Sequence, residues 1–318
     1  MKLAMVFPGQ GSQSLGMMGA YEGHAVIGDT FAEASTLLGQ DLWQLAAEGP
    51  ETALMQTVNT QPLMLTADVA LFRAWSAAGG PLPTVVAGHS LGEYAALVAA
   101  GALAFADAVP LVRFRAEAMQ QAVPEGTGAM AAVMGLDDEA IVAACAEAST
   151  GTGNEGSSEV VEPVNFNAPG QTVIAGTRAA VERAMAGCKA RGAKRALLLP
   201  VSAPFHSSLL KSAADRLATR LETVSFTPPA IPVVHNVDVS TSESAAAIRS
   251  ALARQAASAV RWVETIRDFR RRGVTHVIEC GPGKVLTGLV RRVDSELITL
   301  PLDSSAAMTE AIDTVAHA

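Results

Sequence analysis

Short apolar runs alternate along the chain with longer segments of helix-forming residues. Residues 3–7 form an apolar run that stops at a Pro-Gly pair, which favours a buried strand entering a tight loop. Residues 83–87 form a second run, and residues 91–100 after it favour a helix that ends at Gly101. A strand, a glycine-bounded turn and a helix in this order predict a βα unit of a parallel sheet. Further strands of the same kind are predicted by the apolar runs 196–199, 231–234 and 277–278.

The middle of the chain has a different pattern. Strands are expected at 129–135, 160–167, 172–175 and 194–200, with one helix at 137–149. A second helix is expected to be capped by Thr177 and to run to about residue 191. The order β-α-β-β-α-β is the ferredoxin-like pattern. We therefore predict a small subdomain over residues 130–198, inserted into a larger α/β domain made of residues 1–129 and 199–318. Thr150–Ser158 is rich in Gly, Ser, Thr and Asn, a composition typical of a flexible loop.

Composition narrows the class of protein. Of the 318 residues 49% are apolar and 17% charged, which supports a large buried core and excludes disorder as the main state. Lys and Arg number 23 against 31 Asp and Glu, a net charge of −8, and no basic cluster carries interleaved aromatic residues. A nucleic acid is therefore not an expected partner.

The sequence also bears on location. The three cysteines are far apart and have no metal-ligand spacing, so we expect a reducing compartment and no metal site. The first residues lack the pattern of a signal peptide, and the uncharged stretch between Glu93 and Asp107 is shorter than the roughly 20 residues that span a bilayer. We expect a cytoplasmic protein without a membrane partner.

Ser90 lies in the strongest chemical motif, Gly88-His-Ser-Leu-Gly92. In a Gly-x-Ser-x-Gly elbow the serine occupies a strained turn between a strand and a helix, and its hydroxyl is exposed for attack. The expected strand before the motif and helix after it supply this context. The plainer alternative is an ordinary turn serine.

A serine hydroxyl needs a base within hydrogen-bonding reach. The chain has six histidines, and His206 and His235 both follow predicted strand ends, where active-site loops of open α/β sheets gather. His276 lies inside a predicted strand, and His89 is expected to diverge from its neighbour Ser90. Spacing alone does not choose between His206 and His235.

An attacked acyl carbonyl also needs N–H donors for its oxyanion. The backbone N–H of Leu91, at the start of the predicted helix, is one, and the glycine-rich stretch 7–13 is a candidate for the second. Arg113 and Arg115 lie on one predicted helix and cannot point the same way. A guanidinium beside the serine would pair with a substrate carboxylate, whereas the alternative is a surface arginine.

Six ordered blocks resemble one enzyme family along nearly the whole chain. They are Phe7–Gln13, Gly88–Tyr94, the stretch from Arg115 to Gln120, Asn165–Gln171, Ser202–His206 and Gly281–Leu286. Together they resemble the malonyl-CoA:acyl-carrier-protein transacylases of type II fatty acid synthesis. The resemblance implies an α/β-hydrolase-like core with a ferredoxin-like subdomain, a ping-pong transfer from malonyl-CoA to an acyl carrier protein, and no cofactor.

The resemblance also implies a role for each site residue. Ser90 matches the nucleophile, His206 the catalytic base, and Arg115 the group that holds the malonyl carboxylate. The other positions are backbone atoms, namely the N–H groups of Gln10 and Leu91 for the oxyanion and the carbonyl of Gln255 for orienting the histidine. Two residues differ from the usual family pattern: Ala116 replaces a glycine and Ala259 a proline.

Other functions use the same residues. A serine esterase or thioesterase would pass the acyl group to water. Hydrolases normally have an Asp or Glu between the serine and the histidine in chain order. Acidic residues such as Asp107, Asp137 and Glu162 lie there, so the chain order does not exclude a hydrolase. A malonyltransferase of a malonate decarboxylase would share the site. A non-catalytic scaffold would not need Ser90 and His206 together with an arginine.

Docking of the carrier protein is a further expectation. Carrier proteins of this pathway are acidic, as this chain is, so a local basic cluster is expected to steer the encounter. The candidate groups are Lys189, Arg191, Lys194 and Arg195 in the small subdomain, and Arg270–Arg272 and Arg291-Arg292 in the large one.

Overall fold

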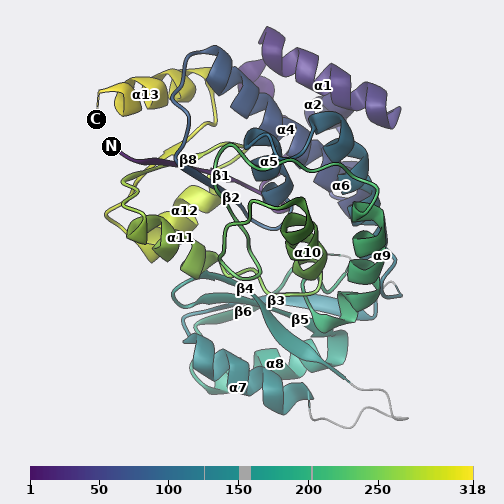
Figure 1. The fold of residues 1–318 in the computed structure, drawn as a ribbon. Coiled ribbons are helices and arrows are strands. Elements are labelled where there is room, and N and C mark those ends of the chain that lie inside the picture. Colours follow the sequence, from purple (N-terminus) through teal and green to yellow (C-terminus); the bar gives the residue numbers. More distant parts are fainter. Residues whose placement is uncertain (125, 150–158, 202, 318) are drawn as a thin grey trace.

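Two separate sheets organise the chain (Figure 1). The computed structural model describes residues 1–124, 126–149, 159–201 and 203–317. The predicted loop Thr150–Ser158 lies outside the described residues. None of the helices in the described ranges is long and apolar enough to cross a membrane.

The first sheet has five strands in the order β7-β2-β1-β8-β9, and every neighbouring pair is parallel. Its strands are β1 (Leu3–Phe7), β2 (Val85–Gly88), β7 (Val233–Val234), β8 (His276–Glu279) and β9 (Ile298–Pro301). The predicted strands at 3–7, 83–87, 231–234 and 277–278 are confirmed as members of this sheet. The edge strand β9 was not expected from the sequence.

Helices cover both faces of the parallel sheet, as the alternation of side chains along its strands requires. Met5 and Phe7 of β1 pack into a core with α1, α4, α5 and α6, whereas Ala4 and Val6 face a second core with α11 and α12. The helices around this sheet are α1 (Ala25–Leu38), α2 (Leu42–Glu48), α3 (Glu51–Leu54), α4 (Thr57–Ala77), α5 (Gly92–Ala99), α6 (Phe105–Gln120), α9 (Lys211–Leu221), α10 (Ala245–Gln255), α11 (Trp262–Arg271), α12 (Val285–Val293) and α13 (Ser305–Ala316).

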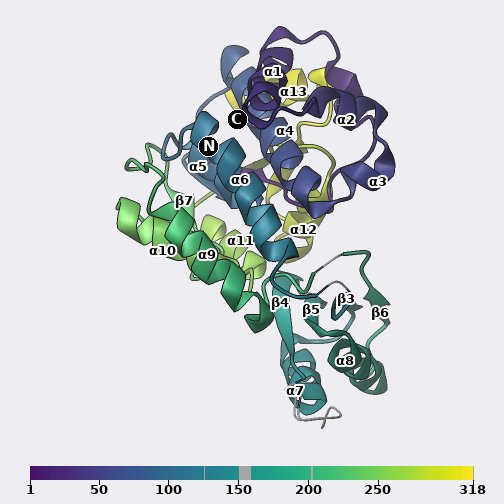
Figure 2. The same cartoon turned by 90° about the vertical axis from the view of Figure 1, so that its right-hand side faces the viewer.

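The second sheet is antiparallel, with the order β4-β5-β3-β6. It contains β3 (Gly128–Met134), β4 (Val161–Ala168), β5 (Gln171–Thr177) and β6 (Arg195–Leu198), with α7 (Asp138–Ser149) and α8 (Arg178–Ala190) between strands. Its α7 and α8 lie on the face away from the parallel sheet (Figures 1 and 2). Its other face packs against side chains such as Met119 of α6 and Ala213 of α9. The predicted β-α-β-β-α-β order is confirmed.

Two expectations about this region need correction. The run 196–199 does not join the parallel sheet, because its strand β6 pairs antiparallel with β3. Thr177 does stand at the N-cap position of α8, but its side chain makes no capping hydrogen bond.

Candidate active site

The elbow around Ser90 is held in a conformation that only flanking glycines permit. Ser90 has a φ of +53°, in the left-handed region that non-glycine residues rarely adopt. A Cβ on Gly88 would lie 1.8 Å from the backbone carbon of Gly92, and a Cβ on Gly92 would lie 2.0 Å from the carbonyl oxygen of Phe7. Because both glycines allow this close packing, β2 and α5 meet in a sharp turn with Ser90 at its apex.

His206 lies directly beside this serine. Its Nε2 is 2.7 Å from the Ser90 Oγ, and its Nδ1 is 2.8 Å from the backbone carbonyl oxygen of Gln255. A carbonyl oxygen only accepts, so Nδ1 carries the proton and Nε2 is free to accept one. Burial, reinforced by the positive charge of Arg115, lowers the pKa of His206 to about 3. The imidazole is therefore neutral at physiological pH.

The other histidines near the elbow have different partners. His235 is buried, and its Nδ1 is 2.7 Å from Oε1 of Glu93. His89 lines the same cavity as Ser90, and its Nε2 is 2.8 Å from Oδ1 of Asn167. The structure thus brings His206, and not His235, to the serine hydroxyl. The side chain of His89 is bonded to Asn167 instead of to Ser90.

The two arginines of α6 separate as their spacing predicts. Arg115 is buried, and its Nη2 donates to Ser90 Oγ at 3.1 Å and to Gln255 Oε1 at 3.0 Å. Its Nη1 donates to Gln61 Oε1 at 2.6 Å. Arg113 instead points to Gln40 of the loop after α1. Only Arg115 reaches the serine.

The two residues whose backbone N–H groups were named from the resemblance lie close to the serine. Gln10 and Leu91 both line the cavity that holds Ser90 and His206. Among the described residues, no group accepts a hydrogen bond from the backbone N–H of Gln10 or Leu91. Both donors are therefore available to an oxyanion.

Several site residues were not expected from the sequence. Asn236 accepts from the Ser90 backbone N–H at 2.7 Å and donates to the Gly88 carbonyl at 2.7 Å, so it braces the elbow. Its position after a predicted strand end was the one available signal. Gln61 lies in the second turn of α4, where nothing in the local sequence marks it. The Gln255 side chain was also missed, because only its backbone carbonyl was anticipated.

The cavity lies between the two sheets. Its lining combines residues of the elbow and α6 with Met130 of β3, Asn165 of β4, and Leu199 and Val201 after β6. In the described part of the chain, no three His, Cys, Asp or Glu side chains are grouped to hold a metal ion. A serine, a neutral imidazole, two free N–H donors and a buried guanidinium are a set of groups suited to transferring an acidic acyl group.

The fold and the site together define a class, the serine acyltransferases built on a parallel α/β sheet. The chain belongs to the acyl transferase family, whose domain model matches residues 4–297. Its relatives narrow the group to malonyl transfer. The malonyl CoA-acyl carrier protein transacylase of Salmonella typhimurium is 53% identical over 98% of this chain and 99% of its own length. The one of Bacillus subtilis is 44% identical over 99% of this chain and 97% of its own.

Solved structures give the same result. The acyl-carrier-protein S-malonyltransferase of Burkholderia pseudomallei 1710b matches with a TM-score of 0.95 and 58% identity, over 98% of this chain and 100% of that one. A malonyl-transacylase in complex with a type II PKS acyl-carrier protein matches with a TM-score of 0.95 and 51% identity, over 99% and 100% of the two chains. The expected family and fold class are confirmed.

Proposed function

We propose that this chain moves a malonyl group from coenzyme A to the phosphopantetheine thiol of an acyl carrier protein, through a malonyl-serine intermediate in fatty acid biosynthesis. One observation carries the choice of acyl group. The guanidinium of Arg115, 1% exposed and 3.1 Å from Ser90 Oγ, forms no ion pair with any carboxylate of the described residues. A buried cation without an anionic partner is suited to a substrate that brings its own carboxylate.

In the first half-reaction Ser90 takes the malonyl group. Nε2 of His206 accepts the hydroxyl proton while Oγ attacks the thioester carbonyl. The N–H groups of Gln10 and Leu91 stabilise the resulting oxyanion. The carbon–sulfur bond then breaks, and the coenzyme A sulfur leaves with the proton from His206.

The second half-reaction reverses these steps with a new acceptor. His206 takes the proton of the phosphopantetheine thiol, and the sulfur attacks the malonyl-serine carbonyl. The same two N–H groups stabilise the second oxyanion. When the ester bond breaks, Ser90 recovers its proton from His206. The chain's own groups supply every step, so the proposed reaction uses no cofactor.

Arg115 holds the malonyl carboxylate in this scheme. A guanidinium offers paired N–H donors that match the two oxygens of a carboxylate. Gln61 accepts from Nη1 of the guanidinium and Gln255 from Nη2, and the ring centroid of Tyr94 lies 5.4 Å from its central carbon. The hydrogen-bond acceptors of Arg115 are neutral and orient the guanidinium, and the carboxylate of Glu93 attracts its charge without forming an ion pair with it.

The same proposal covers organisation and location. Residues 130–198 form the small subdomain and residues 1–129 and 199–318 the large one, and the substrate lies between them. The three cysteines are free and buried, which suits a reducing compartment, and we place the reaction in the cytoplasm.

Intact-mass measurement after mixing with malonyl-CoA tests the proposal. We expect wild type to gain one malonyl group, which disappears on addition of a phosphopantetheinylated acyl carrier protein. The Ser90→Ala variant should gain nothing. A malonyl adduct on Ser90→Ala would contradict the nucleophile. An adduct lost to water as fast as to the carrier protein would indicate a thioesterase instead.

A further inference from the structure

Glu93 is a buried carboxylate with no part in the steps above. It lies in the first turn of α5, three residues after Ser90, and is 0% exposed. Its Oε1 accepts from His235 Nδ1 at 2.7 Å, and its Oε2 accepts from the Asn236 backbone N–H at 3.0 Å. Oε2 also accepts from Nε2 of Gln255 at 2.8 Å. Glu93 does not line the cavity, so it does not contact a bound substrate.

Gln255 connects Glu93 to the site. Besides Glu93, its Nε2 donates to the backbone carbonyl of Ser90 at 2.9 Å, and its Oε1 accepts from Arg115 at 3.0 Å. Its own backbone carbonyl accepts from His206. One buried residue at the end of α10 therefore contacts the nucleophile, the base and the guanidinium.

The direction of the Gln255 amide matters for Arg115. A glutamine amide has a donor end and an acceptor end, whereas a carboxylate only accepts and a guanidinium only donates. The carboxylate of Glu93 thus requires the NH2 end on its own side, which leaves the oxygen facing Arg115. In the flipped orientation two donors would meet at Arg115 and two acceptors at Glu93.

We propose that Glu93 is a positioning residue for malonyl selectivity, because its carboxylate fixes the Gln255 amide in the one orientation that holds the Arg115 guanidinium beside Ser90. His235 and Asn236 keep the carboxylate in place by donating to it. This inference rests on the proposed function, since it gives Arg115 the substrate carboxylate.

The Glu93→Gln variant tests this role with almost no change of shape. A glutamine at this position offers a donor as well as an acceptor, so the Gln255 amide is no longer restricted to one orientation. We expect the ratio of kcat/KM for malonyl-CoA to that for acetyl-CoA to fall about tenfold, as for the loss of one hydrogen bond to a charged group. Acetyl-serine formation, which does not use Arg115, should stay within about twofold.

A matched control separates selectivity from stability. Glu279 is another buried carboxylate, 1% exposed, and its oxygens accept from the backbone N–H groups of Leu286 and Thr287. Glu279→Gln should lower the thermal midpoint while leaving the malonyl-to-acetyl ratio unchanged. If Glu93→Gln only loosened the packing, the rates with malonyl-CoA and acetyl-CoA would fall together and their ratio would not change.

A double-mutant cycle tests the path through the amide. Gln255→Met removes the side-chain amide and keeps the backbone carbonyl that His206 uses. We expect Gln255→Met to lower the ratio, and Glu93→Gln to change it no further in that background. If Glu93→Gln does not fold, Gln255→Met carries the test alone, and an unchanged ratio there overturns the inference.

Different experimental results would contradict the role of Glu93 and the proposed function. A folded Glu93→Gln with an unchanged ratio, or effects of the two substitutions that add fully, would overturn the role of Glu93. A wild-type chain that acquires no malonyl group would contradict the proposed function before any variant is compared.

Discussion

Arg113 and Arg115, two residues apart on α6, have opposite surroundings. Arg113 is partly exposed and bonded to Gln40, whereas Arg115 is buried against Gln61, Gln255 and Ser90. Burial lowers the pKa of Arg115, but from a value so high that the group stays charged. A charge in this position has consequences for any substrate that carries the opposite one.

Replacing Arg115 should separate malonyl from acetyl transfer. A buried carboxylate without its partner costs about 3–5 kcal/mol, so Arg115→Ala should lower malonyl-serine formation more than a hundredfold. Acetyl-serine formation should survive or rise. Rates measured by rapid quench with both thioesters check this, with Arg113→Ala as the control that changes neither. An equal fall in both rates would contradict the role of Arg115 as a carboxylate clamp.

The depressed pKa of His206 gives a pH prediction. With a folded pKa of about 3, Nε2 loses its capacity to accept a proton only as the pH falls through that value, and not near 6.5. Single-turnover malonyl-serine formation should therefore show no decline centred near pH 6.5. A decline with that midpoint in wild type would contradict the lowered pKa of His206.

The same shift affects stability, and the sign follows from proton binding. The unfolded chain protonates this histidine near pH 6.5, but the folded chain does not until about pH 3. The contribution to folding is thus complete above pH 6.5 and is lost as the pH falls from 6.5 towards 3. His206→Gln should make the free energy of unfolding less dependent on pH in this window, as denaturant titrations can measure.

At the scale of elements, the turn between β2 and α5 decides where the nucleophile lies. Phe7 of β1 pairs with Gly88 of β2, and its carbonyl oxygen lies against Gly92. Strands β1 and β2 and the start of α5 therefore pack so closely that no side chain fits at Gly92. The strained φ of Ser90 persists because this packing leaves no alternative.

Gly92→Ala should break this arrangement. Its Cβ would meet backbone atoms that cannot move without shifting β1, so we expect a loss of about 3 kcal/mol in unfolding free energy together with loss of malonyl-serine formation. Gly28→Ala on α1 is the control, because a Cβ there meets nothing within 4 Å. That variant should gain about 0.5–1 kcal/mol. Equal stability of the two variants would contradict the packing argument.

Local sequence patterns were sufficient to predict most helices and strands, but not which strands pair with each other. The run 3–7 is wholly apolar, the run 83–87 is apolar apart from Thr84, and both end at turn residues, so their place in a buried parallel sheet followed from the pattern. The run 196–199 has the same local appearance, yet β6 pairs with β3. Strand β9 is short, at the edge of the sheet and partly exposed, so its residues carry little hydrophobic signal.

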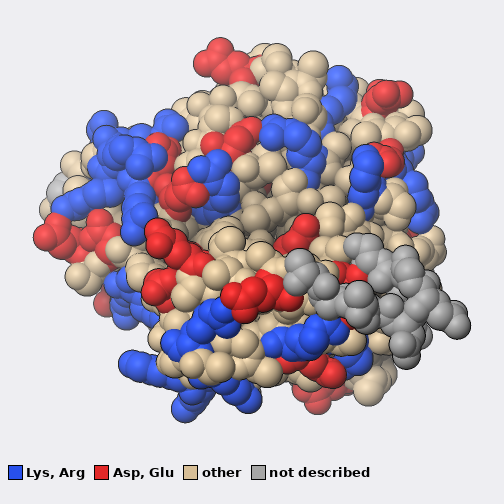
Figure 3. Space-filling view, turned by 90° about the horizontal axis from the view of Figure 1, so that it is seen from below, with Lys and Arg blue, Asp and Glu red and all other residues tan. Residues whose placement is uncertain are grey.

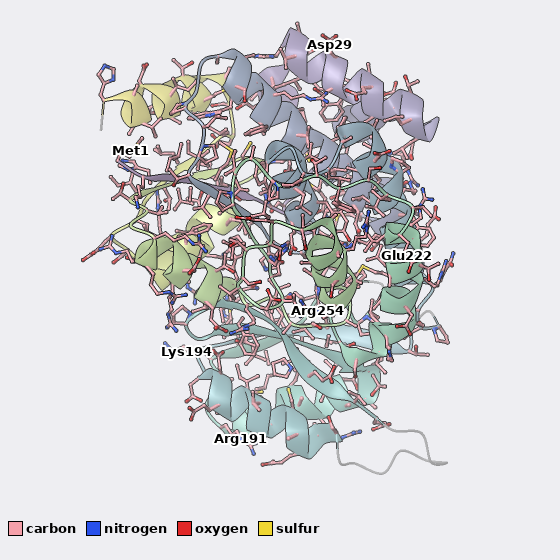
Figure 4. All side chains as sticks on the ribbon, in the orientation of Figure 1. Met1, Asp29, Arg191, Lys194, Glu222 and Arg254 are labelled. Atoms are coloured by element: carbon pink, nitrogen blue, oxygen red, sulfur yellow. The ribbon has the colours of Figure 1, made fainter. Side chains whose placement is uncertain are left out.

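At the scale of the molecule, the cavity lies where the two sheets meet, and residues from both parts of the chain line it. Strand β6 runs into Leu199 and Val201 of the cavity lining, and Lys194 and Arg195 are exposed at its start. Seen from below, basic and acidic side chains are mixed over this end of the molecule (Figure 3). Lys194 lies beside the antiparallel sheet and Arg191 lower, near α7 and α8 (Figure 4).

Ion pairs distinguish the basic groups named from the sequence. Arg270, Arg271 and Arg272 are paired with carboxylates of their own surroundings, and Arg191 is paired with Glu147. Arg291 and Arg292 also have no ion pair in the described ranges, but their guanidinium groups are bonded to Thr299 and Gln171. Lys189, Lys194 and Arg195 make no ion pair with any carboxylate of the described residues. These three keep their charge available for an acidic carrier protein.

Charge reversal tests their use. Changing Lys189, Lys194 and Arg195 together to Glu should raise the KM for the carrier protein about tenfold at low salt, and the effect should shrink as salt screens it. Malonyl loading from coenzyme A should not change. Lys2→Glu, at the start of β1, is the control. An unaltered KM for the triple variant would exclude this group of residues from docking.

By itself, the sequence determined the features that depend on neighbours along the chain. These include the glycine-flanked serine, most strands and helices, the β-α-β-β-α-β order and, through its ordered blocks, the family resemblance. The choice of His206 over His235 needed that resemblance, since both follow strand ends. Tertiary structure alone brought Asn236 and Gln255 to Ser90 and Glu93 of the elbow, because hydrogen bonds between residues more than 140 positions apart leave no local pattern.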